Sequence, residues 1–118
     1  MNRIIANDKG KIIISQEVIV TLAGIATTEC YGIVGMASQK FKDGIVELLG
    51  KEALSKGVQV DLKNDRLQIN VSIIVGYGTK ISEIAHNVIN KVKYTVEKYT
   101  GLSVDHVQVN VQGVRVVD

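Results

Sequence analysis

Residues 58–75 read VQVDLKNDRLQINVSIIV, with apolar side chains at every second position on both sides of Asn64-Asp65. A period of two is typical of strands that bury one face. Asn and Asp tolerate the backbone of a tight turn, so this pair predicts the turn between two strands. The segment therefore predicts a β-hairpin with one apolar and one polar face.

The period changes from two to that of a helix after Gly76-Tyr77-Gly78. Eight apolar residues then fall on one stripe of the predicted helix. They are Ile81, Ile84, Ala85, Val88, Ile89, Val92, Val96 and Tyr99. Burying them would contribute on the order of 10 kcal/mol before conformational entropy is subtracted, so this helix is expected to dock on a sheet. Gly101 is expected to end it.

The N-terminal third predicts a strand followed by a helix. Lys11 to Ile14 is a β-branched run, and Ser15 stands where a helix N-cap is expected. Apolar residues at helical spacing extend this helix to about Cys30. These residues are Val18, Ile19, Leu22, Ala23, Ile25 and Ala26. A second short apolar run, Ile33 to Ala37, follows.

The remaining segments complete an α+β pattern. Helical spacing of apolar residues from Ile45 to Leu54 predicts a middle helix. Val104 to Val111 alternates as a last strand, and the change of phase at Gly113 predicts a bulge. The order β-α-β-α-β-β-α-β predicts one two-layer domain over residues 1–118. We expect a mixed sheet of about four to five strands with two main helices on one face.

Composition excludes several classes of protein. The chain has 118 residues, of which 46% are hydrophobic, which is enough for one domain with its own core. A net charge of +2 is too small to imply a polyanionic partner by itself. The single cysteine, Cys30, excludes an internal disulfide, and we interpret it as a buried thiol in a reducing compartment.

The sequence predicts a cytoplasmic protein. Residues 1–10 carry charges and lack the apolar core of a secretory signal. The longest uncharged stretches, residues 18–28 and 67–79, are shorter than the roughly 20 residues that span a bilayer. We therefore expect no direct membrane insertion, and any membrane association would come through a partner.

Residues with catalytic or metal-binding chemistry form no recognised motif. His86 and His106 have no cysteine or carboxylate at a metal-ligand spacing. The pair Asp105-His106 has no serine or cysteine tied to it by a motif, and no two carboxylates are placed for acid/base catalysis. We predict no metal site, no cofactor and no enzymatic activity.

The Gly-rich segment Gly76 to Lys80 leads from a strand to a helix N-terminus, where free N–H groups can hold an anion. Gly76, Gly78, Thr79 and Lys80 are therefore a candidate anion-binding turn. The segment lacks a third glycine at position 81 and is not a Walker loop. A plain tight turn whose glycines permit positive φ is the favoured interpretation.

Nucleic-acid binding is the alternative function that the lysines suggest. Lys80, Lys91, Lys93 and Lys98 lie on one predicted helix, and residues 32–35 superficially match the GXXG loop of KH domains. However, acidic residues share that helix, residues 33 and 34 are apolar and read as strand, and the strands carry no aromatic stacking platform. Nucleic acid is therefore the runner-up partner.

The polar side of the predicted strands is amide-rich and nearly uncharged. Its members are Gln59, Gln68, Asn70, Ser72, Gln108, Asn110 and Gln112. These residues form either a hydrated outer face or a docking surface with little charge to desolvate. The valine-rich C-terminal strand could also pair edge to edge with another chain.

Five segments together resemble the alkaline shock protein family, especially the branch usually encoded beside a dihydroxyacetone-kinase-like fatty acid kinase subunit. The resemblance covers nearly the whole chain. Its segments are Gly10-Lys11-Ile12 with Ser15-Gln16-Glu17-Val18-Ile19, Cys30-Tyr31-Gly32-Ile33-Val34-Gly35-Met36, Gly57-Val58-Gln59-Val60, Tyr77-Gly78-Thr79-Lys80-Ile81-Ser82-Glu83 and Val111-Gln112-Gly113-Val114-Arg115-Val116.

The resemblance implies a non-enzymatic cytoplasmic protein linked to cell-envelope stress. Some members of the family are held at the membrane by a separate anchor and self-associate. The family supplies no catalytic residues to carry over. On this basis we expect an interaction protein or scaffold whose partner is a membrane-anchored envelope protein, a lipid-metabolism protein, or a second copy.

Overall fold

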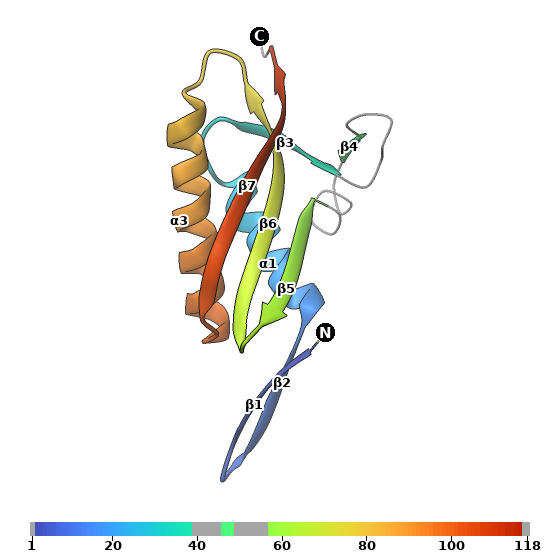
Figure 1. Cartoon of the computed structure of the whole chain (residues 1–118), viewed down its shortest axis with the longest axis vertical. Helices are drawn as coiled ribbons and strands as arrows, with labels where there is room; N and C mark the ends of the chain where they lie inside the picture. Colours follow the sequence, from blue (N-terminus) through green and yellow to red (C-terminus); the bar gives the residue numbers. More distant parts are fainter. Residues whose placement is uncertain (1, 39–45, 49–56, 117–118) are drawn as a thin grey trace.

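The fold combines a five-stranded sheet, a separate two-stranded hairpin and two helices (Figure 1). The computed structural model describes residues 2–38, 46–48 and 57–116. The elements are β1 (Asn2–Asn7), β2 (Gly10–Ser15), α1 (Gln16–Thr28), β3 (Ile33–Ser38), β4 (Val46–Leu48), β5 (Val58–Lys63), β6 (Arg66–Gly76), α3 (Ile81–Thr100) and β7 (Val104–Arg115).

Strand β6 is the centre of the main sheet. Strands β5 and β3 pair with it antiparallel, β5 along residues 66–71 and β3 along residues 73–75. Strand β7 pairs with β6 in parallel along residues 67–76. Strand β4 extends the sheet from β3. The predicted mixed sheet is thus confirmed.

The turn between β5 and β6 forms as its sequence predicts. Asn64 and Asp65 have φ angles of 52° and 63°, and Lys63 pairs with Arg66 across the turn. Two central residues with positive φ match the right-handed twist of the flanking strands. This turn sets the register that sends Val58, Val60, Leu67, Ile69 and Val71 into the core.

Helices α1 and α3 cover one face of the main sheet, as predicted. Buried residues of α1, such as Ile19 and Ala23, and of α3, such as Val88 and Val92, belong to one core cluster with the alternating residues of β6. Figure 1 shows both helices on one side of the strands. The two-layer α+β architecture is therefore confirmed.

Helix α3 follows its predicted stripe in the middle but not at its ends. Ile84, Val88, Val92 and Val96 are buried, whereas Ile81 is 43% exposed and Tyr99 is also exposed. The apolar stripe is therefore longer than the surface that covers it. At its C-terminus, Gly101 has a φ of 75° and donates its N–H to the Glu97 carbonyl at 3.0 Å, so the predicted stop is confirmed.

The register of β6 shifts at three places, two in its pairing with β7 and one in its pairing with β3. One of the two shifts with β7 falls between Leu67 and Gln68. The pairing of β6 with β7 shifts between Ile73 and Ile74, whose partners are Val111 and Gly113. This shift confirms the predicted bulge. The shift in β3 falls between Ile33 and Gly35, so residues 32–35 are not a KH-type loop but the entry to a strand.

The predicted middle helix is wrong over residues 46–48. Those residues form β4, and Met36 pairs with Leu48 in an antiparallel register. Pairing with the β3 edge outweighs the local helical spacing of apolar residues there. The rest of the predicted helix, residue 45 and residues 49–54, lies outside the described residues.

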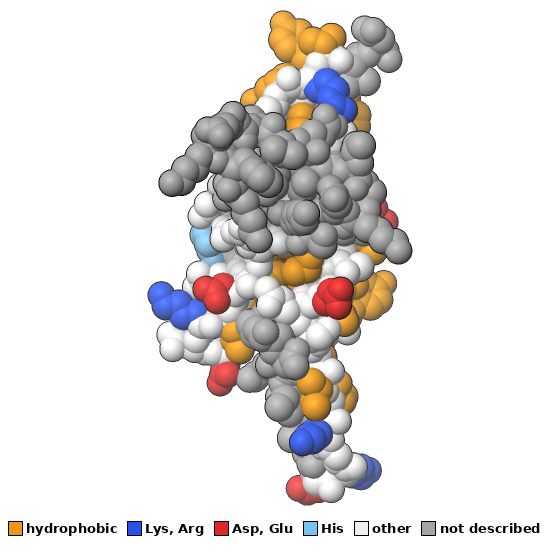
Figure 2. All heavy atoms as spheres, turned by 90° about the vertical axis from the view of Figure 1, so that its right-hand side faces the viewer, with side chains coloured by type: hydrophobic (Ala, Val, Ile, Leu, Met, Phe, Trp, Pro, Cys, Tyr) orange, Lys and Arg blue, Asp and Glu red, His pale blue; other side chains and the backbone are white. Residues whose placement is uncertain are grey.

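The N-terminal hairpin is an element that the sequence prediction lacked. Strand β1 pairs with β2 antiparallel, Asn7 with Gly10 at the turn and Asn2 with Ser15 at the base. Figure 1 shows the hairpin extending away from the main sheet, at one end of a molecule that measures 55 × 28 × 23 Å. Figure 2 shows hydrophobic side chains at its surface.

Candidate interaction surfaces

A row of amide side chains crosses three strands on the sheet face opposite the helices. Gln59 pairs with Asn70, and Asn70 pairs with Gln108, so the three lie side by side on β5, β6 and β7. Their sequence neighbours, including Val58, Val60, Ile69 and Val71, point into the core, which sends the amides to the other face. We call Gln59, Asn70 and Gln108 the amide row. It contains no charged side chain.

The rest of the predicted polar face is not uniformly solvated. Gln59 and Gln108 are exposed, and Gln68, Asn70, Asn110 and Gln112 are half-buried. Ser72 is only 5% exposed, so its prediction as a solvent-facing residue is wrong. Ile74 and Ala37, on the same face, are buried as well. The accessible part of the face is therefore the amide row and the strand ends beyond it.

Asn110 lies at the boundary between these two parts. Its Oδ1 accepts a hydrogen bond from Gln108 Nε2 at 2.9 Å. Its Nδ2 is buried and has no partner among the described residues. A buried, unpaired amide nitrogen costs free energy, so this side chain is poorly placed for a substitution that adds charge.

Charged side chains lie between the amide row and the β5–β6 turn. A shallow depression of about 400 Å³ is lined by Lys63, Asn64, Arg66, Gln68 and Asp105. Arg66 and Asp105 form an ion pair at 3.3 Å. Both side chains are well solvated, so this pair contributes little to stability and remains available at a surface.

Strand β7 supplies an edge next to the amide row. It pairs with β6 along one side, and no described strand pairs with its other side. Val111 and Val114 are exposed along it. Such an edge presents backbone N–H and C=O groups that can pair with another chain.

The candidate anion-binding turn uses most of its backbone donors internally. The N–H groups of Gly76, Tyr77 and Thr79 donate to the carbonyls of Gly32, Arg115 and Gly76 at 3.0, 2.7 and 3.3 Å. Gly78 has a φ of 88°, as a tight turn requires. Lys80 lies 3.9 Å from Glu83. These contacts favour the plain turn.

The lysines of α3 do not form one basic surface. Lys80 and Lys91 each lie 3.9 Å from a carboxylate, that of Glu83 and that of Glu29 respectively. Lys98 lies 5.5 Å from the ring centroids of both Tyr94 and Tyr99. Lys93 is exposed. Three of these four cations therefore lie next to a carboxylate or an aromatic ring rather than next to one another.

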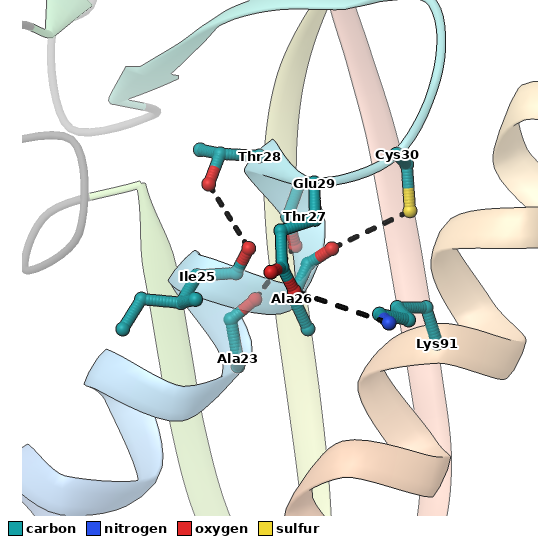
Figure 3. Close-up of polar contacts among 8 residues, drawn as sticks. All are labelled: Ala23, Ile25, Ala26, Thr27, Thr28, Glu29, Cys30 and Lys91. Carbon is teal, nitrogen blue, oxygen red and sulfur yellow. Dashed lines mark hydrogen bonds and ion pairs between the residues drawn. The ribbon is translucent and has the colours of Figure 1, made fainter.

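Cys30 lies just after the end of α1, on the side that faces α3 (Figure 3). Its Sγ lies 3.4 Å from the Ala26 carbonyl oxygen, and the neighbouring Glu29 reaches Lys91 of α3. Burial raises the pKa of the Cys30 thiol; Lys91 lowers this pKa, and Glu29 raises it. A half-buried thiol with a raised pKa is a poor nucleophile.

Metal-binding groups are scattered in the structure. His86 is exposed on α3, and His106 is exposed on β7. Within residues 2–38, 46–48 and 57–116, no group of three or more His, Cys, Asp or Glu side chains could hold a metal ion. Over the same residues, no helix has both the length and the apolarity to cross a membrane.

A second surface, which sequence reasoning missed, lies on α1 and the hairpin. Val18 and Ile25 of α1 and Ile12 and Ile13 of β2 are all exposed. The signal was present: β-branched runs flank Asn7-Asp8-Lys9-Gly10, a pattern typical of a hairpin. The six apolar residues predicted for α1 spread over more than one face of the helix. Their spacing therefore also indicated that some of them would be exposed.

Comparisons with known proteins agree over nearly the whole chain. The model of the alkaline shock protein 23 family, described by its cell envelope-related function, matches residues 4–116. The uncharacterized protein YloU of Bacillus subtilis is 57% identical over 110 residues, which cover 92% of each chain. The uncharacterized protein Spy1614 of Streptococcus pyogenes serotype M6 is 41% identical, over 92% of this chain and 90% of the relative.

A solved structure shares the fold. The zinc form of a MamM CTD variant superposes with a TM-score of 0.50 and covers 86% of this chain and 89% of its own. Its sequence identity of 13% extends the likeness to the fold alone.

Proposed function

This chain belongs to the alkaline shock protein 23 family, whose function is related to the cell envelope, and on that premise we propose that it is a non-enzymatic interaction protein. It acts as a scaffold that binds another protein involved in envelope maintenance. The observation that carries the proposal is the amide row, Gln59, Asn70 and Gln108, which lies uncharged beside the open edge of β7. The resemblance to this family in the five sequence segments is confirmed by these matches.

The amide row suits a protein partner for a physical reason. Each amide offers both donors and an acceptor, and its removal from water costs far less than that of a charge. The ion pair of Arg66 and Asp105 then borders the row as a solvated rim. Uncharged centres with polar rims are characteristic of protein interfaces.

The edge of β7 adds a second means of recognition. An extended segment of a partner can pair with the backbone of this strand, while the amide row contacts its side chains. Backbone pairing supplies affinity, and alternate side chains supply selectivity. We propose that the partner is a membrane-anchored envelope protein or a lipid-metabolism protein, bound at the cytoplasmic side.

A pull-down with charge substitutions tests this proposal. Gln59→Lys with Gln108→Lys adds two charges to the exposed ends of the amide row. The matched control, Asn87→Lys with Asn90→Lys, adds the same charge to exposed positions of α3. We expect the wild type and the control to capture the same envelope or lipid-metabolism protein from a detergent-treated lysate, and the amide-row variant to lose it.

Two results would contradict the proposal. One is equal capture by the amide-row variant and the control, because the interface would then lie elsewhere. The other is loss of every partner after nuclease treatment. Nucleic-acid binding would then be the favoured function, and its affinity should fall steeply with added salt. The melting temperatures of both variants are expected to stay close to that of the wild type, since the substituted side chains are exposed.

A further inference from the structure

The helix-facing side of the sheet loses its cover toward the free edge of β7. Residues of neighbouring strands that pair with each other point to the same face. The helix-facing residues of β6 are all 0% exposed; they are Ile69, Val71, Ile73 and Val75. Their partners on β7 become more exposed along the strand, from 6% at Val107 to 36% at Val111 and 54% at Val114. The helices therefore cover β6 completely and leave the second half of β7 open.

The helical layer is also wider than the sheet that it covers. Packed helices lie about 8–10 Å apart and paired strands about 4.8 Å apart, so two helices cover roughly four strands. Along residues 67–71 of β6, the described sheet has only β5 on one side and β7 on the other. Figure 1 shows α3 beyond the free edge of β7, whereas α1 lies behind the strands. One more strand therefore has room beside β7, against α3.

The flank of α3 that faces this open position is mainly apolar. Glu97 identifies the flank, because its carboxylate binds the backbone N–H of Val104 at the start of β7. Residues four apart lie along one side of a helix, so the row that ends at Glu97 shares this flank. The other members of the row are Ile81, Ala85, Ile89 and Lys93. Ile81 is 43% exposed, and Ala85 and Ile89 are half-buried.

We propose that an extended segment of the partner protein occupies the open position and adds to β7 as a further strand. This inference rests on the proposed function and states the chemistry of the segment. Every second side chain of the segment is apolar and covers a surface that we call the apolar margin. The margin consists of Ile81, Ala85 and Ile89 of α3 and Val109, Val111 and Val114 of β7. The intervening side chains are polar and lie beside Gln108 on the outer face.

The backbone of β7 favours a strand over a lipid or a helix. The N–H and C=O groups along its free side have no strand partner in the part of the chain that the structure describes. An acyl chain or a helix face would cover the apolar margin but leave these groups without hydrogen bonds. An added strand pairs with them and covers the margin at the same time.

Lys93 gives the segment a preferred charge. It is exposed one helical turn beyond Ile89 on the same flank. No carboxylate of the described residues lies within ion-pair distance of Lys93, whereas Lys80 and Lys91 each have one. An aspartate or glutamate at the end of the segment near Lys93 supplies the missing opposite charge. The segment is therefore an alternating apolar and polar strand with an acidic end.

A synthetic peptide tests the apolar contact. The probe is a fluorescent peptide of about eight residues, within the usual length of a strand, that alternates valine with threonine and ends in aspartate. Its binding to the full chain is measured by fluorescence anisotropy. Ile81→Lys should weaken binding at least about tenfold, whereas Ile25→Lys on α1, which changes a 42% exposed residue, should leave it unchanged. Far-UV circular dichroism checks that both variants fold.

Two N-methylated peptides test the backbone pairing. Each carries N-methyl groups at alternate residues, so each loses the N–H donors of one edge and keeps all of its side chains. Only the peptide that keeps the donors facing β7 should bind. In NMR hydrogen exchange, binding should protect the amide protons of β7 that do not pair with β6.

A charge exchange tests the role of Lys93. At low salt, Lys93→Glu should weaken binding of the peptide about threefold, and a peptide that ends in lysine should restore it. The control is Lys98→Glu, which makes the same change on α3 outside the row and should have no effect. Failure of the lysine peptide to restore binding would contradict the charge preference.

Three results would overturn the inference as a whole. The first is a wild-type chain that binds no peptide at near-millimolar concentration. The second is binding that Ile81→Lys and both N-methylated peptides leave unchanged. The third is protection of the free β7 amides that rises with the concentration of the chain alone, because a second copy would then occupy the edge. A wild type that captures its partner in the pull-down but binds no peptide would keep the proposed function and lose this inference alone.

Discussion

The carboxylate of Glu97 accepts a hydrogen bond at 3.0 Å from the backbone N–H of Val104, which joins the last turn of α3 to the first residue of β7. Beside it, the Thr100 hydroxyl donates to the Val96 carbonyl at 2.6 Å and accepts from the Leu102 N–H at 3.1 Å. Val104 and Leu102 are buried, so their N–H groups have little access to water. Glu97 and Thr100 therefore hold the connection from which β7 begins.

Replacement of Glu97 by Ala should lower the free energy of unfolding by about 1–2 kcal/mol, because it leaves the Val104 N–H unpaired. Glu97→Gln keeps an oxygen acceptor and should lose about half as much. Urea denaturation measures both. Glu83→Ala is the control, because Glu83 is exposed on the same helix and its contact with Lys80 is solvated. A control as unstable as Glu97→Ala would show that the hydrogen bond is not the cause.

The elements with one buried face were predictable from the sequence. Strands β5 and β6, the turn at Asn64-Asp65 and helix α3 were predicted because burial of one face imposes a period on the chain. The stop at Gly101 and the bulge near Gly113 were predicted from backbone requirements that glycine meets. In each case a local physical demand fixes the residue type.

The features that the prediction missed depend on contacts between residues that are distant in the sequence. Strand β4 follows from pairing with β3, which local spacing does not reveal. The burial of Ser72 depends on how the outer face of the sheet is covered, which the alternating pattern of residues around Ser72 does not indicate. Glu97 belongs to the polar side of α3 by spacing, and only the path of the chain after Gly101 brings Val104 to it.

The connection between α1 and β3 passes close to α3 at Gly32, and a substitution there tests this close packing. Its φ is 88°, and a Cβ added there would overlap the Ile84 side chain. Gly101 has a similar φ of 75° but no atom within 4 Å of an added Cβ. Gly101→Ala should cost about 1 kcal/mol of backbone strain, and Gly32→Ala should cost that strain plus roughly 1–3 kcal/mol of overpacking. Equal losses in thermal or urea denaturation would contradict the close packing on Ile84.

Substitutions at Ser72 and Gln59 test whether the outer face of the sheet has a buried part and an exposed part. Ser72→Lys places a charge at a buried position, so we expect a loss of at least about 2–3 kcal/mol or failure to fold. Gln59→Lys changes an exposed position and should alter stability by less than about 0.5 kcal/mol. Ser72→Ala, which adds no charge, keeps the comparison informative if Ser72→Lys does not fold. Urea denaturation with equal midpoints for Ser72→Lys and Gln59→Lys would refute the burial of this part of the face.

Cys30 gives a prediction in the alkaline range. Burial raises the pKa of its thiol, so iodoacetamide should modify Cys30 more slowly at pH 8 in the folded chain than in urea, since the thiolate is the reactive form. Lys91→Gln removes a cation that lowers this pKa and should slow the reaction further. Lys93→Gln, an exposed change on the same helix, is the control and should not.

The same shift makes stability depend on pH with a defined sign. Because the folded chain holds the thiol proton more tightly than the unfolded chain, the contribution of Cys30 is complete below the unfolded pKa and is lost as pH rises through the folded pKa. Urea denaturation at pH 7 and at increasing alkaline pH should therefore show a wild type that loses more stability than Cys30→Ala does. Parallel curves for the two proteins would mean that the thiol has the same pKa in the folded and unfolded chains, and that burial does not raise the pKa of Cys30.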